Sequence, residues 1–201
     1  MAQEPKSLKD LNRAISHARP FVTGGTKAVL GEGPLHPDLA LVGEQPGDQE
    51  DLQGRPFVGP AGKLLDRALA EAGIDRDEIY ITNAVKHFKY RLRGKRRLHA
   101  KPNAGEIKHY RRWLKTEMEL VKPRVVVALG ASAVLALAGH ALTISANRGR
   151  TDFDGQCGFI TVHPSSLLRI REEKDRRAAF RKFVSDLEKA KEFAAEARCA
   201  A

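Results

Sequence analysis

Short apolar runs alternate with stretches of helical periodicity along most of this chain. Four runs have the length and the β-branched content of buried strands. The expected strands cover residues 39–42, 78–85, 124–130 and 158–162. Apolar residues at helical spacing predict helices over residues 7–18, 61–72, 107–121 and 131–138, and a charged helix runs on to about residue 197. The helix after residue 103 has a capping-box start, with Asn103 and Glu106 three residues apart.

Strands that alternate with helices are typical of a parallel sheet with both faces covered. The pattern therefore predicts an α/β fold, a three-layer α/β/α sandwich around a central four-stranded parallel sheet. At 201 residues the chain is expected to form a single domain over residues 1–201. In it, residues 1–30 supply an N-terminal helix and a connection, and residues 170–201 a C-terminal helix.

Three segments lack this periodicity and are interpreted as irregular. Residues 43–59 form a long acidic loop between the first strand and its helix. Residues 87–103 are punctuated by Gly94 and Pro102 and predict an exposed basic loop. Residues 142–158 predict a polar region with a turn near residues 147–150.

The positive charge is concentrated in one segment. The chain carries a net charge of +10, and residues 86–115 contain twelve lysines and arginines but a single acid, Glu106. A local excess of this kind indicates a polyanion partner, most commonly nucleic acid, although a solvated basic face is the alternative. No run of eighteen apolar residues and no signal-peptide core are present, so we expect a cytoplasmic protein without a membrane partner.

The loops after parallel strands open on the same edge of a sheet, where α/β proteins place their ligands. This edge gathers chemistry from three loops. The first contributes Glu44, Gln45, Asp48 and Asp51, the second Asn83 and the basic loop, and the fourth residues 163–169.

Acids beside a basic loop are unexpected if the partner is a polyanion. Glu44, Asp48, Glu50 and Asp51 would weaken the binding of a phosphate backbone. They make sense if some of them face a metal or a cationic transition state. The alternative is that they cap a helix or pair with Arg55 or Lys63, and the absence of regular ligand spacing argues against a metal.

Three further residues have both a functional and a structural interpretation. His163 stands at the end of an apolar strand, and it is either a proton donor or a structural histidine. Asn83 is either a reader of a base edge or a turn residue. Phe57 is an aromatic in a polar loop, so it either stacks on a base or packs beneath the loop.

Four motifs taken together resemble the uracil-DNA glycosylase superfamily, and most closely its family 4-type branch. They are GEQPGD (residues 43–48), GRPFVG (54–59), TNAVK (82–86) and HPSSLLR (163–169). The loop GKRRLH (94–99) resembles the Lys-Arg-Arg-aliphatic-His loop of the UdgX subgroup, whose members become covalently bound to uracil-containing DNA.

The resemblance implies a DNA repair protein that flips uracil out of DNA, excises it and stays linked to the sugar C1′ through His99. It assigns catalysis to Glu44, His99, His163, Asp48 and Asp51. It assigns substrate binding to Gln45, Gly47, Phe57, Asn83, Lys86, Ser165 and Arg169, and DNA binding to Lys95, Arg96 and Arg97. The expected partner is uracil-containing DNA, preferably single-stranded, bound by a monomer in the bacterial cytoplasm with a nucleoid-associated function.

One departure from these relatives concerns a cofactor. They usually hold an iron–sulfur cluster through cysteines, whereas this chain contains only Cys157 and Cys199. Tyr110 stands where another ligand is expected, so we predict no cofactor and no metal site.

Two other functions fit the same motifs. The first is a conventional glycosylase that releases uracil, leaves an abasic site and turns over. The second is a non-catalytic module for nucleic acid, in which His99 is merely one polar residue of a binding loop.

Overall fold

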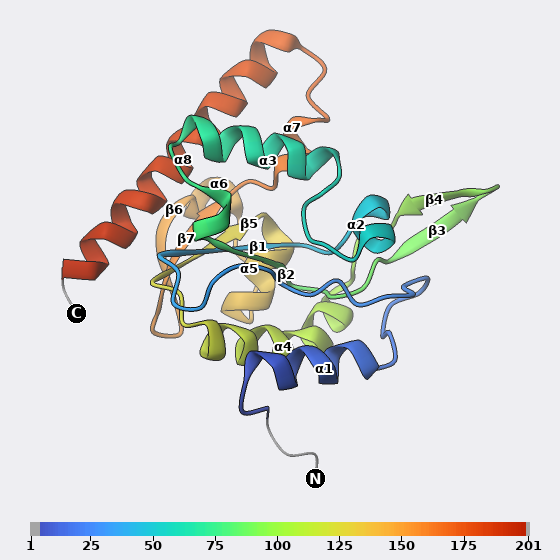
Figure 1. Cartoon of the computed structure of the whole chain (residues 1–201). Helices are drawn as coiled ribbons and strands as arrows, with labels where there is room; N and C mark the ends of the chain where they lie inside the picture. Colours follow the sequence, from blue (N-terminus) through green and yellow to red (C-terminus); the bar gives the residue numbers. More distant parts are fainter. Residues whose placement is uncertain (1–4, 200–201) are drawn as a thin grey trace.

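The four expected strands form the parallel part of a five-stranded sheet in the computed structural model, which describes residues 5–199 (Figure 1). Residues 1–4 and 200–201, which belong to the predicted terminal segments, lie outside the described residues. The parallel strands are β1 (Leu39–Gly43), β2 (Tyr80–Asn83), β5 (Val125–Leu129) and β7 (Gln156–Thr161). The order across the sheet is β2-β1-β5-β7-β6, and the edge strand β6 (Gly149–Phe153) runs antiparallel to β7.

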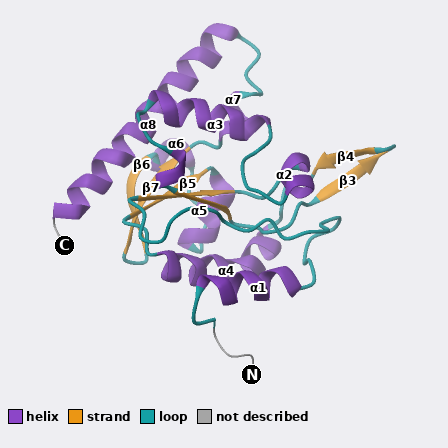
Figure 2. Cartoon of the chain, viewed as in Figure 1, coloured by secondary structure: helices purple, strands orange, loops and turns teal. Residues whose placement is uncertain are grey.

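Helices cover both faces of the sheet (Figure 2). One core lies under α3 (Pro60–Glu71) and α8 (Glu173–Cys199). The other lies under α1 (Leu8–His17), α4 (Ala104–Val121) and α5 (Ala131–Ala138). Strand β1 serves both, because its successive side chains point to opposite faces: Leu39 and Leu41 join the first core, and Ala40 and Val42 the second. The predicted α/β/α sandwich is confirmed.

The strand order places a topological switch point between β1 and β5. The chain leaves β1 toward β2 on one side and later returns past β1 to β5 on the other. The loops after β1 and β5 therefore diverge and leave a crevice at the carboxyl ends of these strands, which is where such sheets bind ligands.

The prediction of an irregular basic loop over residues 87–103 is wrong. Residues 90–99 form a β-hairpin of β3 (Tyr90–Arg93) and β4 (Arg96–His99), which turns at Gly94 with φ 59°. The hairpin extends away from the body of the protein (Figure 1). Most of its side chains are exposed, but Phe88, Tyr90 and Leu92 alternate with Lys89, Arg91 and Arg93 just before Gly94, and this short strand period was a missed signal.

Two other predicted loops also contain regular structure. The acidic loop includes α2 (Asp48–Gln53), and the polar region before β7 includes α6 (Ile144–Asn147) and β6. Strand β6 is joined to β7 by Asp154 and Gly155, which have φ of 55° and 90°. An Asp-Gly pair with two positive φ angles is a common two-residue hairpin connection. The Asp-Gly dipeptide in the sequence was therefore the signal for a β6–β7 hairpin that the prediction missed. The remaining short helices are η1 (Arg76–Glu78) and α7 (Pro164–Leu167).

The predicted start of α4 is confirmed by a complete capping box. Oδ1 of Asn103 accepts a hydrogen bond from the Glu106 N–H at 2.9 Å, and Glu106 accepts one from the Asn103 N–H at 2.7 Å. Within residues 5–199 no helix combines the length and the apolarity that crossing a bilayer requires.

A buried ion pair joins β2 and the loop after it to α4. Nζ of Lys86 lies 2.5 Å from Oε2 of Glu117, and neither side chain is exposed. Thr82 accepts a hydrogen bond from Lys86 at 2.7 Å, and the Tyr80 hydroxyl donates to Glu117 at 2.9 Å. Burial, and then the charge of Glu117, raise the pKa of Tyr80 far above its usual value, so this hydroxyl keeps its proton and donates. Both charged side chains are fully buried, and this excludes Lys86 from contact with a ligand.

Breaking this pair is expected to destabilise the fold. Lys86→Met leaves the Glu117 carboxylate buried without a cation, so the free energy of unfolding should fall by about 3 to 5 kcal/mol in urea denaturation. Adding Glu117→Gln removes the unpaired charge and should recover at least half of that loss. Equal stability of the single and double variants would contradict a stabilising pair.

Candidate active site

A cavity of about 800 Å³ opens at the switch point, at the carboxyl ends of β1, β5 and β7. It contains ten of the fifteen site residues expected from the sequence, although these come from loops and strands far apart in the chain. They are Glu44, Gln45, Gly47, Asp48, Phe57, Asn83, His99, His163, Ser165 and Arg169. The predicted convergence of the loops on one edge is therefore found in the structure.

Glu44 follows β1 and is held from the opposite side of the crevice. Oγ of Ser132 donates a hydrogen bond to its Oε2 at 2.5 Å. Ser132 lies in the first turn of α5, where backbone N–H groups favour a negative charge. The sequence reasoning missed Ser132, yet its place just after the third apolar strand puts it on the same edge. The carboxylate of Glu44 is thus fixed in position at the cavity wall.

His99 ends β4 and enters the cavity beside Glu44. Its Nε2 lies 3.4 Å from Oε1 of Glu44 and 2.9 Å from Nε2 of Gln45. The orientation of the Gln45 amide is determined by the backbone: its oxygen accepts from the Lys89 N–H at 3.1 Å, and its nitrogen donates to the carbonyl of Ala100 at 3.1 Å. The amide nitrogen also lies 3.2 Å from the carbonyl of Lys89, so three acceptors compete for its two hydrogens, and His99 is one of them when its Nε2 carries no proton. Nε2 of His99 stands in the cavity between this amide and the carboxylate of Glu44.

Arg97 fastens the hairpin to α2. Its guanidinium lies 2.6 Å from Asp48 and 2.5 Å from Asp51, and it stacks over the rings of Phe88 and Tyr90 at 5.5 and 5.3 Å. The acids therefore pair with Arg97 and not with Arg55 or Lys63, the partners considered from the sequence. Because Arg97 is two residues from His99, the clamp also determines where His99 sits.

His163 caps the start of α7 and presents a hydrogen-bond donor. The Ser165 N–H donates to its Nδ1 at 3.2 Å, so in the neutral ring the proton sits on Nε2. Burial, with smaller contributions from His99 and Arg169, lowers the pKa of His163 to about 4. The ring is therefore neutral near pH 7, with one N–H available to a ligand.

Phe57 and Asn83 meet across Gly43. Phe57 has a left-handed backbone, with φ 53°, an unusual state for a bulky residue that is common at ligand sites. A Cβ on Gly43 would collide with the Phe57 ring and with Oδ1 of Asn83. Glycine is thus required for these two side chains to converge at the end of β1. Together they offer a ring face and an amide edge.

Five expected site residues do not line the cavity. Asp51 is buried against Arg97, and Lys86 belongs to the ion pair with Glu117, so both have structural contacts where ligand contacts were expected. Arg97 acts as the clamp, and Lys95 and Arg96 lie near the turn of the hairpin. The sequence reasoning also missed Lys101, which lines the cavity. Glu50, one of the four acids noted in the sequence, has the capping role: it accepts from the N–H groups of Gly47 and Gly59 at 3.0 and 2.8 Å.

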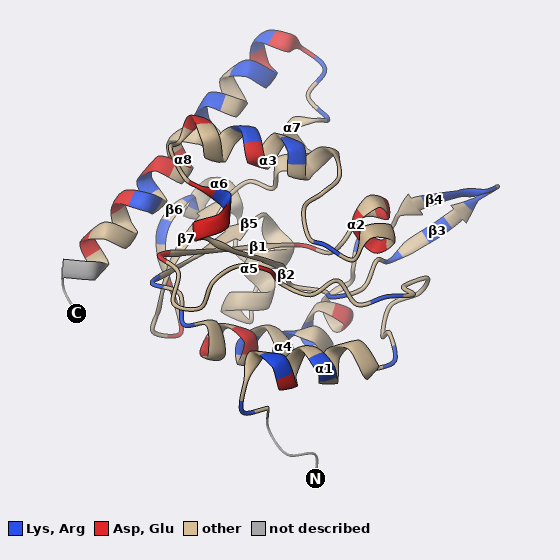
Figure 3. Cartoon of the chain, viewed as in Figure 1, with Lys and Arg blue, Asp and Glu red and all other residues tan. Residues whose placement is uncertain are grey.

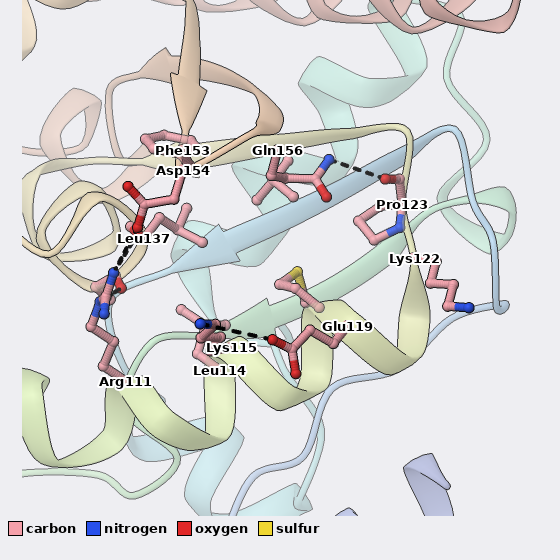
Figure 4. A pocket seen from close by; sticks show the side chains of 13 residues that line it. Arg111, Leu114, Lys115, Glu119, Lys122, Pro123, Leu137, Phe153, Asp154 and Gln156 are labelled. Atoms are coloured by element: carbon pink, nitrogen blue, oxygen red, sulfur yellow. Dashed lines mark hydrogen bonds and ion pairs between the residues drawn. The ribbon is translucent and has the colours of Figure 1, made fainter. Parts of the chain in front are cut away.

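A second cavity, of about 310 Å³, lies between α4, α5 and the β6–β7 turn (Figure 4). Four of its five charged side chains pair with one another: Arg111 lies 3.4 Å from Asp154, and Lys115 lies 4.0 Å from Glu119. No histidine lines it. It lacks the acid, imidazole and amide groups that converge in the larger cavity, so the larger cavity is the candidate site.

The residues present do not fit an iron–sulfur cluster. The hydroxyl of Tyr110 accepts a hydrogen bond from the Phe21 N–H at 3.1 Å and lies 2.8 Å from Nδ1 of His87. Burial lowers the pKa of His87 to about 4, so this ring is a neutral partner of the hydroxyl. Across residues 5–199 no group of three or more His, Cys, Asp or Glu side chains has an arrangement that could hold a metal ion.

The chain is similar to known proteins of one superfamily. The model of the uracil DNA glycosylase superfamily matches residues 30–188. The chain is 40% identical over 179 residues to the type-4 uracil-DNA glycosylase of Thermotoga maritima, which covers 88% of each protein. It is 37% identical over 152 residues to the type-4 uracil-DNA glycosylase of Pyrobaculum aerophilum, covering 71% of this chain and 74% of that protein. It is also 32% identical over 154 residues to the type-5 uracil-DNA glycosylase of the same organism, covering 67% of this chain and 64% of that protein.

The state of His163 can be measured directly. Because its folded pKa lies below the ordinary value of 6.5, acidification should leave the ring neutral through about pH 6 and protonate it near pH 4. The Cε1–H resonance, assigned by its absence in His163→Gln, reports this titration in NMR spectra. A midpoint near the ordinary value would contradict the buried, donor-presenting ring.

Proposed function

The chain belongs to the uracil-DNA glycosylase superfamily, and we propose that it excises uracil from DNA and remains covalently linked to the deoxyribose through His99. The observation that carries the covalent step is the position of Nε2 of His99, 3.4 Å from the carboxylate of Glu44 inside the cavity. A hydrolytic glycosylase needs the carboxylate but has no need of a second nucleophile at that place.

The cavity suits a nucleotide that has been flipped out of the base stack. Its volume lies in the range of small-molecule sites, and it combines an aromatic ring, an amide and cationic groups. The ring of Phe57 would stack on uracil, and the amide of Asn83 would read the polar edge of the base. Arg169 and Lys101 would hold the flanking phosphates. Each of these four side chains thus has a counterpart in deoxyuridine phosphate.

The excision step separates charge. The C1′–N1 bond breaks, its electron pair leaves with uracil, and the sugar becomes an oxocarbenium-like cation. Glu44 would stabilise this cation, and the N–H of His163 would donate to the anionic oxygen of the departing uracil. Both groups are held by other side chains or backbone before the ligand arrives, so little reorganisation is needed.

The trapping step forms one new bond. The lone pair on Nε2 of His99 attacks C1′, and uracil takes up a proton from water as it leaves. The product is an imidazolium joined to deoxyribose, with no hydroxide added to the sugar. Gln45 would keep the attacking nitrogen oriented, and the Arg97 clamp would keep β4 close to Glu44.

A turning-over glycosylase is the second candidate, and the similarity to type-4 enzymes favours it. In that case water, oriented by Glu44, attacks C1′, and an abasic site is released. A non-catalytic binding module would leave the pre-positioned Glu44 and the neutral His163 without a purpose. The preference for single-stranded DNA, the monomeric state and the cytoplasmic location remain parts of the proposal.

The two catalytic outcomes separate on a denaturing gel. After incubation with uracil-containing single-stranded DNA, the wild-type protein should give a heat-stable band of protein joined to DNA. His99→Ser should lose this band, and alkali-labile product should exceed the amount of enzyme if water reaches C1′. His140→Ser, which changes an exposed histidine elsewhere, should keep the band. A wild-type protein that forms no band and yields product in excess would refute the covalent step.

Excision should not depend on iron. The purified protein is expected to be colourless, and prolonged treatment with an iron chelator should leave both its melting temperature and the yield of excised uracil unchanged, because His87 and Tyr110 bond to each other directly. A loss of either property on chelation, restored by ferrous iron and sulfide, would show that a cluster is present and needed.

A further inference from the structure

The β3–β4 hairpin has two chemically different faces. Residues that oppose each other in an antiparallel pair share a face, and the observed register joins Arg91 with Leu98 and Arg93 with Arg96. These four side chains form one face, which we call the outer face. The other face carries Tyr90, Leu92, Arg97 and His99.

Only the face of Arg97 and His99 is neutralised by the protein. On that face Arg97 is the cation, and it contacts two carboxylates. Arg91, Arg93 and Arg96 of the outer face are all exposed, and among residues 5–199 none of them has an acidic partner. Figure 3 shows basic residues along the projecting hairpin as far as its tip, and acids in α2 beside its base.

Without a binding partner, this arrangement destabilises the hairpin. Arg93 and Arg96 are directly opposite each other, and like charges across a strand pair destabilise it. A two-stranded hairpin is marginal in water even without such repulsion. The outer face also exposes Leu98, which is 43% accessible. Such a face is complementary to a polyanion that offers apolar edges as well, and nucleic acid has both.

We propose that the outer face of the hairpin binds the phosphates of the DNA strand that continues beyond the uracil nucleotide, through Arg91, Arg93 and Arg96, with Leu98 against its sugars or bases. The inference deepens the proposed function, since it rests on DNA occupying the neighbouring cavity. It also gives the arginines of the hairpin two different roles. Arg97 holds the hairpin in place, whereas Arg91, Arg93 and Arg96 bind the DNA strand.

The distance from the reactive centre sets the length of DNA required. Arg96 lies three residues before His99 on the same strand, about 10 Å away at the usual rise per residue. At about 3.4 Å per stacked nucleotide, the outer face meets the strand about three nucleotides from the uracil. A very short substrate should therefore fill the cavity without touching the outer arginines.

The test compares two substrate lengths with one triple variant. The variant combines Arg91→Gln, Arg93→Gln and Arg96→Gln. The rate of uracil release is measured as a function of substrate concentration for two substrates: a trinucleotide with a central deoxyuridine, and a single strand of about 20 nucleotides. For the long strand the half-saturating concentration should rise, while the rate at saturation stays unchanged. For the trinucleotide the variant and the wild type should agree.

Salt dependence gives a second readout. Three lost phosphate contacts should lower the slope of log affinity against log salt by about 2, so that between about 50 and 200 mM salt the wild type loses about 20-fold more affinity than the variant. Arg91→Lys, Arg93→Lys and Arg96→Lys together keep the charge and should keep the slope. Arg181→Gln, Lys182→Gln and Lys189→Gln remove the same charge from α8, on the opposite side of the molecule, and should change nothing (Figure 3).

Each outcome decides the proposal. If the half-saturating concentration rises equally for both substrates, or if the rate at saturation falls, the arginines act on the cavity, and the proposal is overturned. An unchanged half-saturating concentration for the long strand would also overturn the proposal. If the wild type releases uracil from neither substrate, the proposed function fails instead, and anisotropy with a uracil-free strand then tests the outer face alone: the triple variant should bind that strand with the reduced salt slope, and an unchanged slope would overturn the inference.

Discussion

The contact between Arg97 and the two aspartates of α2 holds the functional part of this protein together. Within residues 5–199 the hairpin pairs with no strand of the central sheet, and the guanidinium of Arg97 joins it to Asp48 and Asp51 at 2.6 and 2.5 Å. A hairpin of eight paired residues is not stable without such support. The clamp lies two residues from His99, so it converts a projecting ribbon into a support that places an imidazole beside Glu44. The parts of the site that belong to the sheet, Glu44, Asn83 and His163, do not depend on it in this way.

The same contact explains why acids accumulate in a site that attracts DNA. Four carboxylates follow β1, and left free they would repel a phosphate backbone. The structure gives three of them internal partners: Asp48 and Asp51 meet Arg97, and Glu50 caps the N–H groups of Gly47 and Gly59. Glu44, bonded to the neutral hydroxyl of Ser132, is left without a full cationic partner inside the cavity. A single carboxylate there suits a reaction in which positive charge develops on a sugar, and it adds little repulsion elsewhere.

Much of the fold was predictable, because the core strands and helices carry their periodicity in the sequence. The errors fall where that signal is short or weak. The alternation that marks β3 covers only a few residues within a basic segment, and α2 is a short helix whose acids Asp48 and Asp51 face Arg97 of β4. Strand β6 could have been found from its Asp154-Gly155 turn. The site followed the same rule: residues at strand ends were located by topology, whereas Ser132 was missed because serine in a helix start is too common to stand out.

By itself, the sequence determined the alternation of strands and helices, the edge at which the loops meet, the motifs that mark the family and the excess of basic residues in one segment. These are local properties, set by the order of residues along the chain. Only the tertiary structure decided which charge meets which. Lys86 lies in the family motif yet is buried against Glu117, 31 residues away, and Arg97 lies in the basic segment yet meets Asp51, 46 residues away. Pairing across such separations depends on how the layers pack, because the energy of a charge is set by its burial and its neighbours in space.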